Sequence, residues 1–239
     1  EGIAEGIIGQ GQAASPNPVL GWVGSLTHIN AESGYWLKVI EDKDFTVTSE
    51  NISDSNMQYS LSSGANLISY PSGYGEDINT AIPDSDGFDG IIGEGIAASS
   101  NAILGWVGSL VEFEPNHGYW FKVDEDMDFE YNYGSDELSR EMVTHFDYDV
   151  NQSTEQAFYF IENIENIEFG DIVSSYCNGT KVGSRAWNGM YTDIPAMGND
   201  NSDLTKNYCT STSVPTFRVE KANGETCALT GDIPVWESN

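Results

Sequence analysis

Three observations predict a mainly β, multi-domain protein. Residues 7–45 and 91–129 are two copies of one repeat: they align without a gap at an offset of 84 positions, with 24 of 39 positions identical. Apolar runs are short, rich in β-branched and aromatic residues, and separated by Gly, Asn, Pro or Asp. Residues 145–239 contain no copy of the repeat but show the same strand-and-turn pattern, at the size of an immunoglobulin-like β-sandwich.

A helix is expected between the repeats and the last domain. Leu138, Met142 and Phe146 recur at intervals of four, and Ser135 before them is suited to a helix N-cap. The sequence therefore predicts four segments: a partial repeat unit at 1–48, a complete unit at 49–133, a linking helix at 134–144, and a C-terminal β-sandwich domain at 145–239.

Within the complete unit, each block has an expected structure. ANLISYP, which ends at Pro71, is expected to be a strand, and one or two helical turns should follow Asp77 and end before Pro83. The blocks IIGEGIAAS, LGWVGSL, GYWFKV and MDFEY are expected to be further strands. The first copy has only the later half of this pattern. Either it is truncated, or residues 45–69 supply strands to both units.

In the last domain, Asn178-Gly179 is a two-residue hairpin signal between IVSSYC and KVGSRAW. Further strands are expected at AFYFI, VPTFRVE, ETCALT and IPVWES.

The three cysteines are Cys177, Cys209 and Cys227, and no CxxC pattern supports a zinc site or a thioredoxin-type motif. One disulfide with an odd thiol suits an exported protein, and Cys209 with Cys227 is then the favoured pair. Three free buried thiols are the alternative.

The charge is strongly negative, with 38 Asp and Glu against nine Lys and Arg and a net charge of −29. Nucleic acid and anionic membrane surfaces are excluded as partners, because binding phosphate requires cationic side chains. Membrane insertion is not expected, since there is no run of eighteen apolar residues. The chain opens within a repeat, so we interpret it as part of a larger polypeptide.

The repeated GYW-x-KV block contains the candidate ligand-binding residues. If the strand alternates, Trp36 and Lys38 share one face while Tyr35, Leu37 and Val39 share the other. A face with an exposed Trp could stack against sugar rings, whereas the structural alternative is that these tryptophans fill small β-cores. The candidate ligand-binding residues in the two copies are Trp36, Lys38, Trp120 and Lys122.

A calcium loop is predicted within residues 198–203, because oxygen ligands at close spacing in a tight loop suit this hard cation. The EF-hand pattern is not met, and Asp and Asn are also ordinary turn formers. Calcium is the only candidate cofactor, and the candidate ligands are Asn199, Asp200, Asn201 and Asp203.

Signals for catalysis are few. His28, His117 and His145 are scattered, and neither His28 nor His117 recurs in the other copy of the repeat. There is no HExxH, GxSxG or Walker pattern. The sequence favours a non-catalytic protein over an enzyme, and no catalytic residue is assigned.

The blocks ANLISYP, IIGEGIAAS, WVGSL and GYWFKV resemble a tandem module found in large exported proteins of marine bacteria. NQSTEQAFYF, GDIVSSYCNG, KVGSRAWNG, DIPAMGNDNSDLT and VPTFRV resemble a second module of the same proteins. The pattern departs at Ala65, where the module has Trp, and at Cys177, which precedes the Asn-Gly turn instead of following it. The resemblance implies a β-rich extracellular or cell-surface protein and implies no reaction.

The expected function is a non-catalytic exported or cell-surface module for adhesion or carbohydrate binding, with carbohydrate or a surface protein as partner. The alternatives are a purely structural spacer of a larger surface protein and a fragment of a secreted hydrolase. The identical residues of the repeat are mainly Gly, Trp, Leu and Val, which serve turns and cores. Any binding specificity is therefore expected in the diverged loop between Leu26 and Gly34 and in its counterpart at 111–117.

Overall fold

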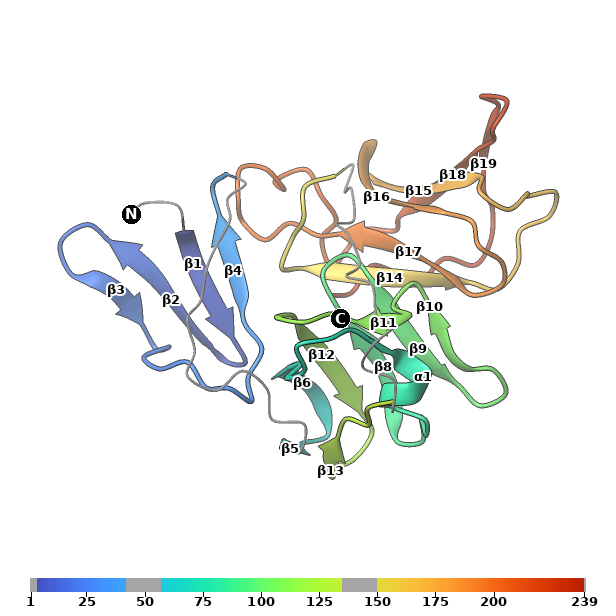
Figure 1. Cartoon of the computed structure of the whole chain (residues 1–239). Coiled ribbons are helices and arrows are strands. Elements are labelled where there is room, and N and C mark those ends of the chain that lie inside the picture. Colours follow the sequence, from blue (N-terminus) through green and yellow to red (C-terminus); the bar gives the residue numbers. More distant parts are fainter. Residues whose placement is uncertain (1–3, 42–56, 135–149, 239) are drawn as a thin grey trace. The chain divides into compact units, whose positions relative to one another are not determined.

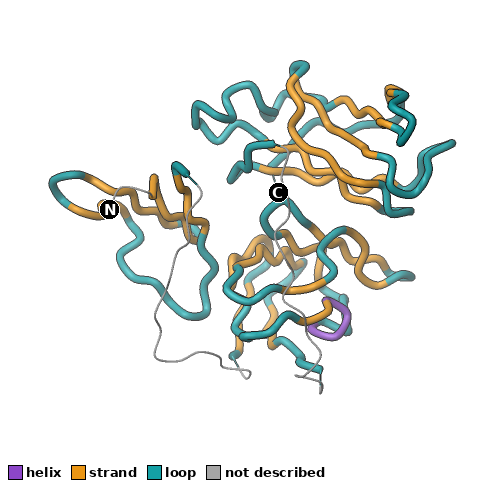
Figure 2. The backbone as a smooth tube through the Cα atoms, turned by 45° about the horizontal axis from the view of Figure 1, so that its top comes forward, coloured by secondary structure: helices purple, strands orange, loops and turns teal. Residues whose placement is uncertain are grey.

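A computed structural model describes residues 4–41, 57–134 and 150–238 and shows a mainly β protein, as predicted (Figure 1; Figure 2). The chain forms two compact units. The N-terminal unit takes in residues 1–93, 99–106 and 110–144, and the C-terminal unit takes in residues 94–98, 107–109 and 145–239. The predicted linking helix lies outside the described residues. No described helix has the length and apolar character needed to cross a bilayer.

The first copy of the repeat forms a four-stranded antiparallel sheet in the order β3-β2-β1-β4 (Figure 1). Its strands are β1 (Ala4–Gly9), β2 (Gln12–Asn17), β3 (Gly21–Gly24) and β4 (Trp36–Val39).

The second copy repeats this order and gains one strand, giving a five-stranded sheet in the order β10-β9-β8-β12-β6. Its strands are β6 (Gly64–Ser69), β8 (Phe88–Ile92), β9 (Ala97–Asn101), β10 (Gly105–Gly108) and β12 (Gly118–Val123). Two short ribbons complete it: β5 (Gln58–Leu61) with β13 (Met127–Glu130), and β7 (Glu76–Asp77) with β11 (Glu112–Phe113).

The predicted helical turn is helix α1 (Ile78–Ala81). The side chain of Asp77 caps it by accepting hydrogen bonds from the backbone N–H groups of Asn79 and Thr80, at 2.9 and 3.3 Å. These bonds satisfy N–H groups that have no partner within the helix, which is why an acidic residue at this position starts it.

The Gly-Ser pair of the repeated WVGSL block has the same local role in both copies. A Cβ atom on Gly24 would lie 2.2 Å from the carbonyl oxygen of Ala13, and one on Gly108 would lie 2.3 Å from that of Ala97. The serine after each glycine accepts a hydrogen bond from the N–H of the same alanine, at 3.2 and 3.3 Å. Only glycine permits this close approach of two strands.

Two other residues of the repeat also make equivalent bonds. Asn17 and Asn101 each accept hydrogen bonds from the N–H groups two and three residues later. The hydroxyl groups of Tyr35 and Tyr119 each accept one from the N–H five residues earlier, at 2.9 and 2.8 Å. The repeated residues thus preserve turns and strand crossings, which supports the interpretation that the repeat is kept as a scaffold.

The core of the second copy is aromatic. Phe113 and Phe121 are fully buried, with ring centroids 6.0 Å apart, and Phe129 lies 5.1 Å from Phe121. Trp106 is buried as well, and its indole N–H donates to the carbonyl oxygen of Ile82 at 3.0 Å. Burying such rings is the main source of stability in a small β-core.

The two copies should respond differently to truncation at the same repeat position. Phe121→Ala should lower the free energy of unfolding by about 3–5 kcal/mol, because it opens a cavity in the aromatic core. Leu37→Ala, at the equivalent position of the first copy, should cost less than about 1 kcal/mol, because Leu37 is exposed. Calorimetry of the full chain compares the two variants, and equal losses would contradict this difference in packing.

Strand β6 bonds to both copies. It forms a six-residue antiparallel ladder with β12, from Gly64 opposite Val123 to Ser69 opposite Gly118. On the first copy it makes one isolated bridge, between Ile68 and Ser33. The side chain of Gln10 adds two bonds to the β6 backbone. Within residues 57–69, β6 thus pairs along the second copy and bonds to the first copy at single residues, and the choice between the two alternatives for residues 45–69 stays a prediction.

The last domain has two antiparallel sheets, seen in the upper part of Figure 1. One pairs β14 (Gln156–Ile161) with β17 (Thr192–Met197), and the other has the order β16-β15-β18-β19. The strands of the second sheet are β15 (Ile172–Cys177), β16 (Thr180–Ala186), β18 (Thr216–Glu220) and β19 (Thr226–Ala228). Both sheets contribute to one core, made of Val173, Trp187, Ile194, Phe217 and Val219. This is the arrangement of a β-sandwich, and its immunoglobulin-like strand order stays a prediction.

The Asn-Gly hairpin prediction is confirmed. Asn178 and Gly179 both have positive φ, as a type I′ turn requires, and they join Cys177 to Thr180 across the β15–β16 pair.

The strand predicted at IPVWES is absent from residues 233–238. This segment is held through Trp236, whose indole N–H donates to the carbonyl oxygen of Ala196 at 2.8 Å. Pro234 has no N–H to donate to a ladder.

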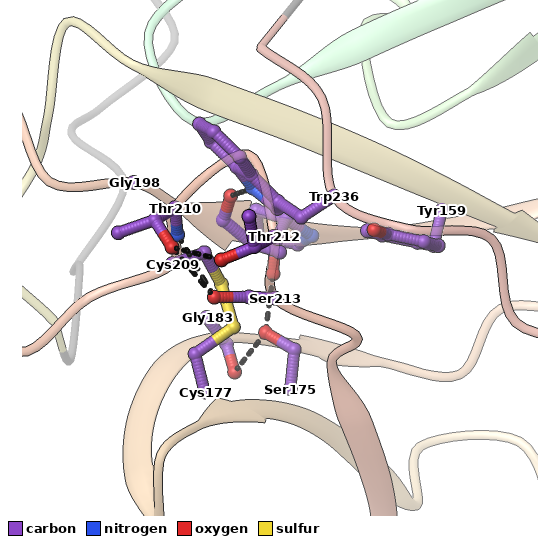
Figure 3. The surroundings of a disulfide bond; sticks show 12 residues. Tyr159, Ser175, Cys177, Gly183, Gly198, Cys209, Thr210, Thr212, Ser213 and Trp236 are labelled. Carbon is purple, nitrogen blue, oxygen red and sulfur yellow. Dashed lines mark hydrogen bonds between the residues drawn. A yellow bond between two sulfur atoms is a disulfide. The ribbon is translucent and has the colours of Figure 1, made fainter.

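The predicted disulfide is wrong. Cys177 pairs with Cys209, and Cys227 is a free, exposed thiol (Figure 3). Cys209 reaches the core because its N–H donates to the carbonyl oxygen of Met197 beside the end of β15, whereas Cys227 lies on the edge strand β19. In Figure 3, Ser175 lies beneath this disulfide and donates to the carbonyl oxygens of Gly183 and Pro195.

Candidate functional site

The GYW-x-KV strand of the second copy alternates as the sequence predicts. Tyr119, Phe121 and Val123 are buried, whereas Trp120 is partly exposed and Lys122 is exposed. Because β12 lies between β6 and β8, Trp120 stands opposite a residue on each neighbour, Leu67 on β6 and Ile92 on β8. Trp120 therefore has an apolar residue opposite it on each neighbouring strand, and of these two Leu67 is buried.

In the equivalent strand of the first copy, the residues at the buried positions of the second copy are the more exposed ones. Trp36 and Lys38 are partly exposed, while Leu37 and Val39 are exposed. Trp36 stands opposite Ile8 on β1. The structure thus places both tryptophans on the face that carries the lysine, and it leaves the opposite, core-type face of the first copy in contact with solvent.

The two GYW segments begin at adjoining glycines. A Cβ atom on Gly118 would lie 2.8 Å from the Cα of Gly34, and one on Gly34 would lie 2.7 Å from the carbonyl oxygen of Ile68. Neither glycine can therefore be replaced without moving a backbone. The N-terminal ends of the two candidate strands are brought together, each two residues before its tryptophan.

The diverged loop differs in structure between the copies. In the second copy, Glu112 and Phe113 form strand β11 by pairing with Asp77 and Glu76 of β7. In the first copy, residues 27–32 form no strand. Strand β7, the partner of β11, belongs to residues 57–83.

The histidines that are described make only local contacts. The ring of His117 bonds through Nδ1 to the carbonyl oxygen of Pro115 at 3.0 Å, and its Nε2 lies 3.9 Å from a carboxylate oxygen of Glu114. The ring of His28 bonds to the hydroxyl of Thr27 at 2.9 Å. His145 lies outside the described residues.

Two of the four candidate calcium ligands, Asn199 and Asp200, bond through their side chains within their own loop. Asn199 Oδ1 accepts from the N–H of Asn201 at 2.8 Å, and Asp200 Oδ1 accepts from the N–H of Ser202 and the hydroxyl of Thr205 at 3.1 and 2.6 Å. These are the bonds of turn-forming residues. The described residues include no group of three or more His, Cys, Asp or Glu that could hold a metal ion. Calcium binding here stays a prediction.

Two carboxylates approach each other on the second copy. The negative charge of Asp89, together with a hydrogen bond between the two side chains, raises the pKa of Asp124 above its ordinary value. Both groups are exposed. Proximity of like charges disfavours having both ionised, but a pair alone supplies too few oxygens for calcium.

A buried ion pair in the C-terminal unit was not expected from the sequence. Arg185 donates to the carboxylate Oδ2 of Asp193 at 2.9 Å and to its backbone carbonyl at 3.1 Å. It also donates to the carbonyl oxygen of Gly95 at 2.7 Å, and Ser109 donates to Oδ2 at 2.8 Å. Burial raises the pKa of Asp193, and Arg185 and Ser109 lower it only in part. The residues lie far apart in the sequence, so no local motif signals this cluster.

The comparisons give no further assignment. Searches against models of protein families, curated proteins and solved structures found no match.

Proposed function

We propose that the protein is a non-catalytic module of an exported or cell-surface polypeptide, and that it binds carbohydrate on the faces that carry Trp36 and Trp120. The observation that carries this proposal is that both rings remain partly exposed on the lysine face, while Tyr119 and Phe121 of the same strand are buried. An amphipathic indole on a flat strand surface suits the apolar face of a sugar ring.

The adjoining glycines support a doubled site. Because Gly34 and Gly118 meet, the two tryptophan strands start from one point, and two weak sites on one body act together on a ligand with repeating units. Lys38 and Lys122 lie two residues after each tryptophan, on the same face of its strand by alternation. Specificity would come from the loops at 27–32 and 111–117, which differ in both sequence and structure.

The disulfide supports the proposed location. Cys177 and Cys209 are buried and bonded, and stable disulfides form in oxidising compartments such as the extracellular space. The resemblance to modules of exported bacterial proteins favours the same location.

A structural spacer is the second candidate, favoured by a separate observation. The residues common to both copies make turn and strand-crossing bonds, such as those of Asn17 and Asn101. A repeat kept only for its scaffold would separate other domains without binding a ligand.

A glycan array distinguishes these two functions. The labelled full chain should bind at least one class of glycan, and Trp36→Ala/Trp120→Ala should reduce the apparent affinity at least tenfold, since aromatic anchors carry most of the binding free energy. Trp22→Ala is the matched control: its ring is exposed on the opposite face, so binding should be retained.

Absence of any bound glycan, or binding that survives the double substitution, would contradict the carbohydrate proposal and favour the spacer. Calorimetry of each variant verifies that the fold is retained.

A further inference from the structure

One face of the first copy is built like a core, yet three of its apolar side chains, Trp22, Leu37 and Val39, are exposed. The register places Ile7 opposite both Ala14 and Leu37, so these side chains share a face of the sheet, and Trp22 and Val39 lie on the same face. We name these five residues the open face.

Equivalent side chains are buried in the second copy. The exposed fractions are 55 and 9 % for Trp22 and Trp106, 38 and 0 % for Leu37 and Phe121, and 46 and 2 % for Val39 and Val123. Some positions outside this face also differ: Ala13 is exposed, whereas its counterpart Ala97 is buried. The tips of the β2–β3 and β9–β10 loops are exposed in both copies, at 86 % for Val19 and 92 % for Ile103.

In the second copy, residues 57–83 border this face and contribute to the core beside it. The rings of Phe113 and Phe129 pack against Phe121, and they in turn contact Tyr70 and Tyr59. Strand β6 pairs along β12, placing Asn66 opposite Phe121 and Gly64 opposite Val123. After helix α1, the carbonyl oxygen of Ile82 accepts the indole N–H of Trp106. Both elements belong to residues 57–83, which we name the front segment.

In the described part of the chain, the first copy has no such cover. Its strand β4 is the last in the order β3-β2-β1-β4, whereas β12 lies between β8 and β6. The position equivalent to Phe88, whose ring lies 5.9 Å from that of Trp106, is Ala4. The open face therefore has smaller side chains than the equivalent face of the second copy, which leaves room for apolar side chains of a binding segment.

The first copy already forms hydrogen bonds with the front segment through residues outside the open face. Gln10 bonds through its side-chain amide to the carbonyl oxygen of Ala65 and to the N–H of Leu67. The N–H of Gly34 donates to the carbonyl oxygen of Leu67, and the N–H of Ser69 donates to that of Glu32. The bonds of Gly34 and Glu32 to the front segment are made just before strand β4, and β4 carries Leu37 and Val39 of the open face.

We propose that the open face binds a front segment supplied by a further repeat unit of the same kind, which would help to bury Trp22, Leu37 and Val39 as residues 57–83 help to bury their counterparts. Exposed apolar patches mark interaction surfaces, and the second copy indicates that the binding segment is one like residues 57–83. This binding does not depend on the proposed carbohydrate function, because Trp36 lies on the opposite face of the sheet.

A synthetic peptide of residues 57–87 carrying a fluorescent label tests the proposal. Titration with the full chain should give saturable anisotropy. Leu37→Asp and Trp22→Ala in the chain should each weaken binding roughly tenfold or more, because each removes a buried apolar contact. Val19→Asp is the control and should bind like the unmodified chain, because Val19 is exposed as its counterpart is.

Hydrogen exchange locates the contact. Bound peptide should protect residues 36–39 and 21–24 of the first copy. The proposal would be overturned if binding were not saturable, or if Leu37→Asp and Val19→Asp bound the peptide equally. It would also be overturned if only the second copy gained protection, because the peptide would then have replaced the chain's own front segment there.

Discussion

Replacing Arg185 by alanine should lower the free energy of unfolding of the C-terminal unit by about 3–5 kcal/mol at neutral pH. Asp193 is almost fully buried, and its Oδ1 has no hydrogen-bond partner among the described residues. Loss of the guanidinium group leaves a buried carboxylate with one remaining donor to Oδ2, Ser109. The cost is that of an uncompensated charge in a medium of low polarity.

Chemical denaturation followed by fluorescence measures this loss, with Arg218→Ala as the matched control. Arg218 is exposed, and its guanidinium carbon lies 4.7 Å above the ring of Tyr176. Its removal should cost no more than about 1 kcal/mol. If both arginine variants lost the same stability, the buried pair would not have the assigned role.

The deficit of the Arg185 variant should depend on pH in a defined direction. Burial raises the pKa of Asp193 in the folded protein, and removing the cation raises it further. The folded state then binds the proton more tightly than the unfolded state, so stability is regained as pH falls through the folded pKa towards the unfolded value of about 3.9. A deficit independent of pH between neutrality and that value would contradict the charge argument.

Breaking the Cys177–Cys209 disulfide should be the second large effect. The bond joins residues 32 positions apart, and restoring the freedom of a loop of that length to the unfolded chain costs about 3–4 kcal/mol of stability. Cys177→Ser/Cys209→Ser should show this loss in calorimetry. The two serines should add a further cost, because they place polar hydroxyl groups in a core that also contains Val182 and Met197.

Cys227→Ser is the control for this substitution. Cys227 is exposed on an edge strand, with its thiol 3.8 Å from a carboxylate oxygen of Glu225, so stability should change by less than about 0.5 kcal/mol. Under reducing conditions the wild-type protein should lose the part of this stability that comes from closing the loop, and somewhat less than the double variant, because its thiols are less polar than serine hydroxyls. A Cys227 variant as unstable as the double variant would instead indicate pairing through Cys227.

Local patterns in the sequence were sufficient for much of the fold. The cap at Asp77, the turn at Asn178-Gly179 and the alternation in GYWFKV depend on neighbouring residues, and the structure contains all three. The fact that Trp120 and Lys122 share a face follows from strand geometry alone. The scaffold role of the repeat was also predictable, since its common residues are those that turns and cores require.

Other features depended on contacts between distant residues. Three cysteines allow several pairings, and only the position of Cys209 beside β17 selects Cys177. The ion pair of Arg185 and Asp193 assembles with Gly95 and Ser109, from segments with no sequence pattern in common. Leu37 is exposed although its counterpart Phe121 is buried, a difference that periodicity cannot show.

Because strand β6 bonds to both copies, the stability of one copy depends on the other. Since β6 bonds to β12 along its length and to Ser33 and Gly34 of the preceding copy, melting of one copy removes partners from the next. Nearest-neighbour coupling of this kind makes stability grow with the number of units and makes unfolding spread along the array. We therefore expect the two copies to unfold together, and not as independent domains.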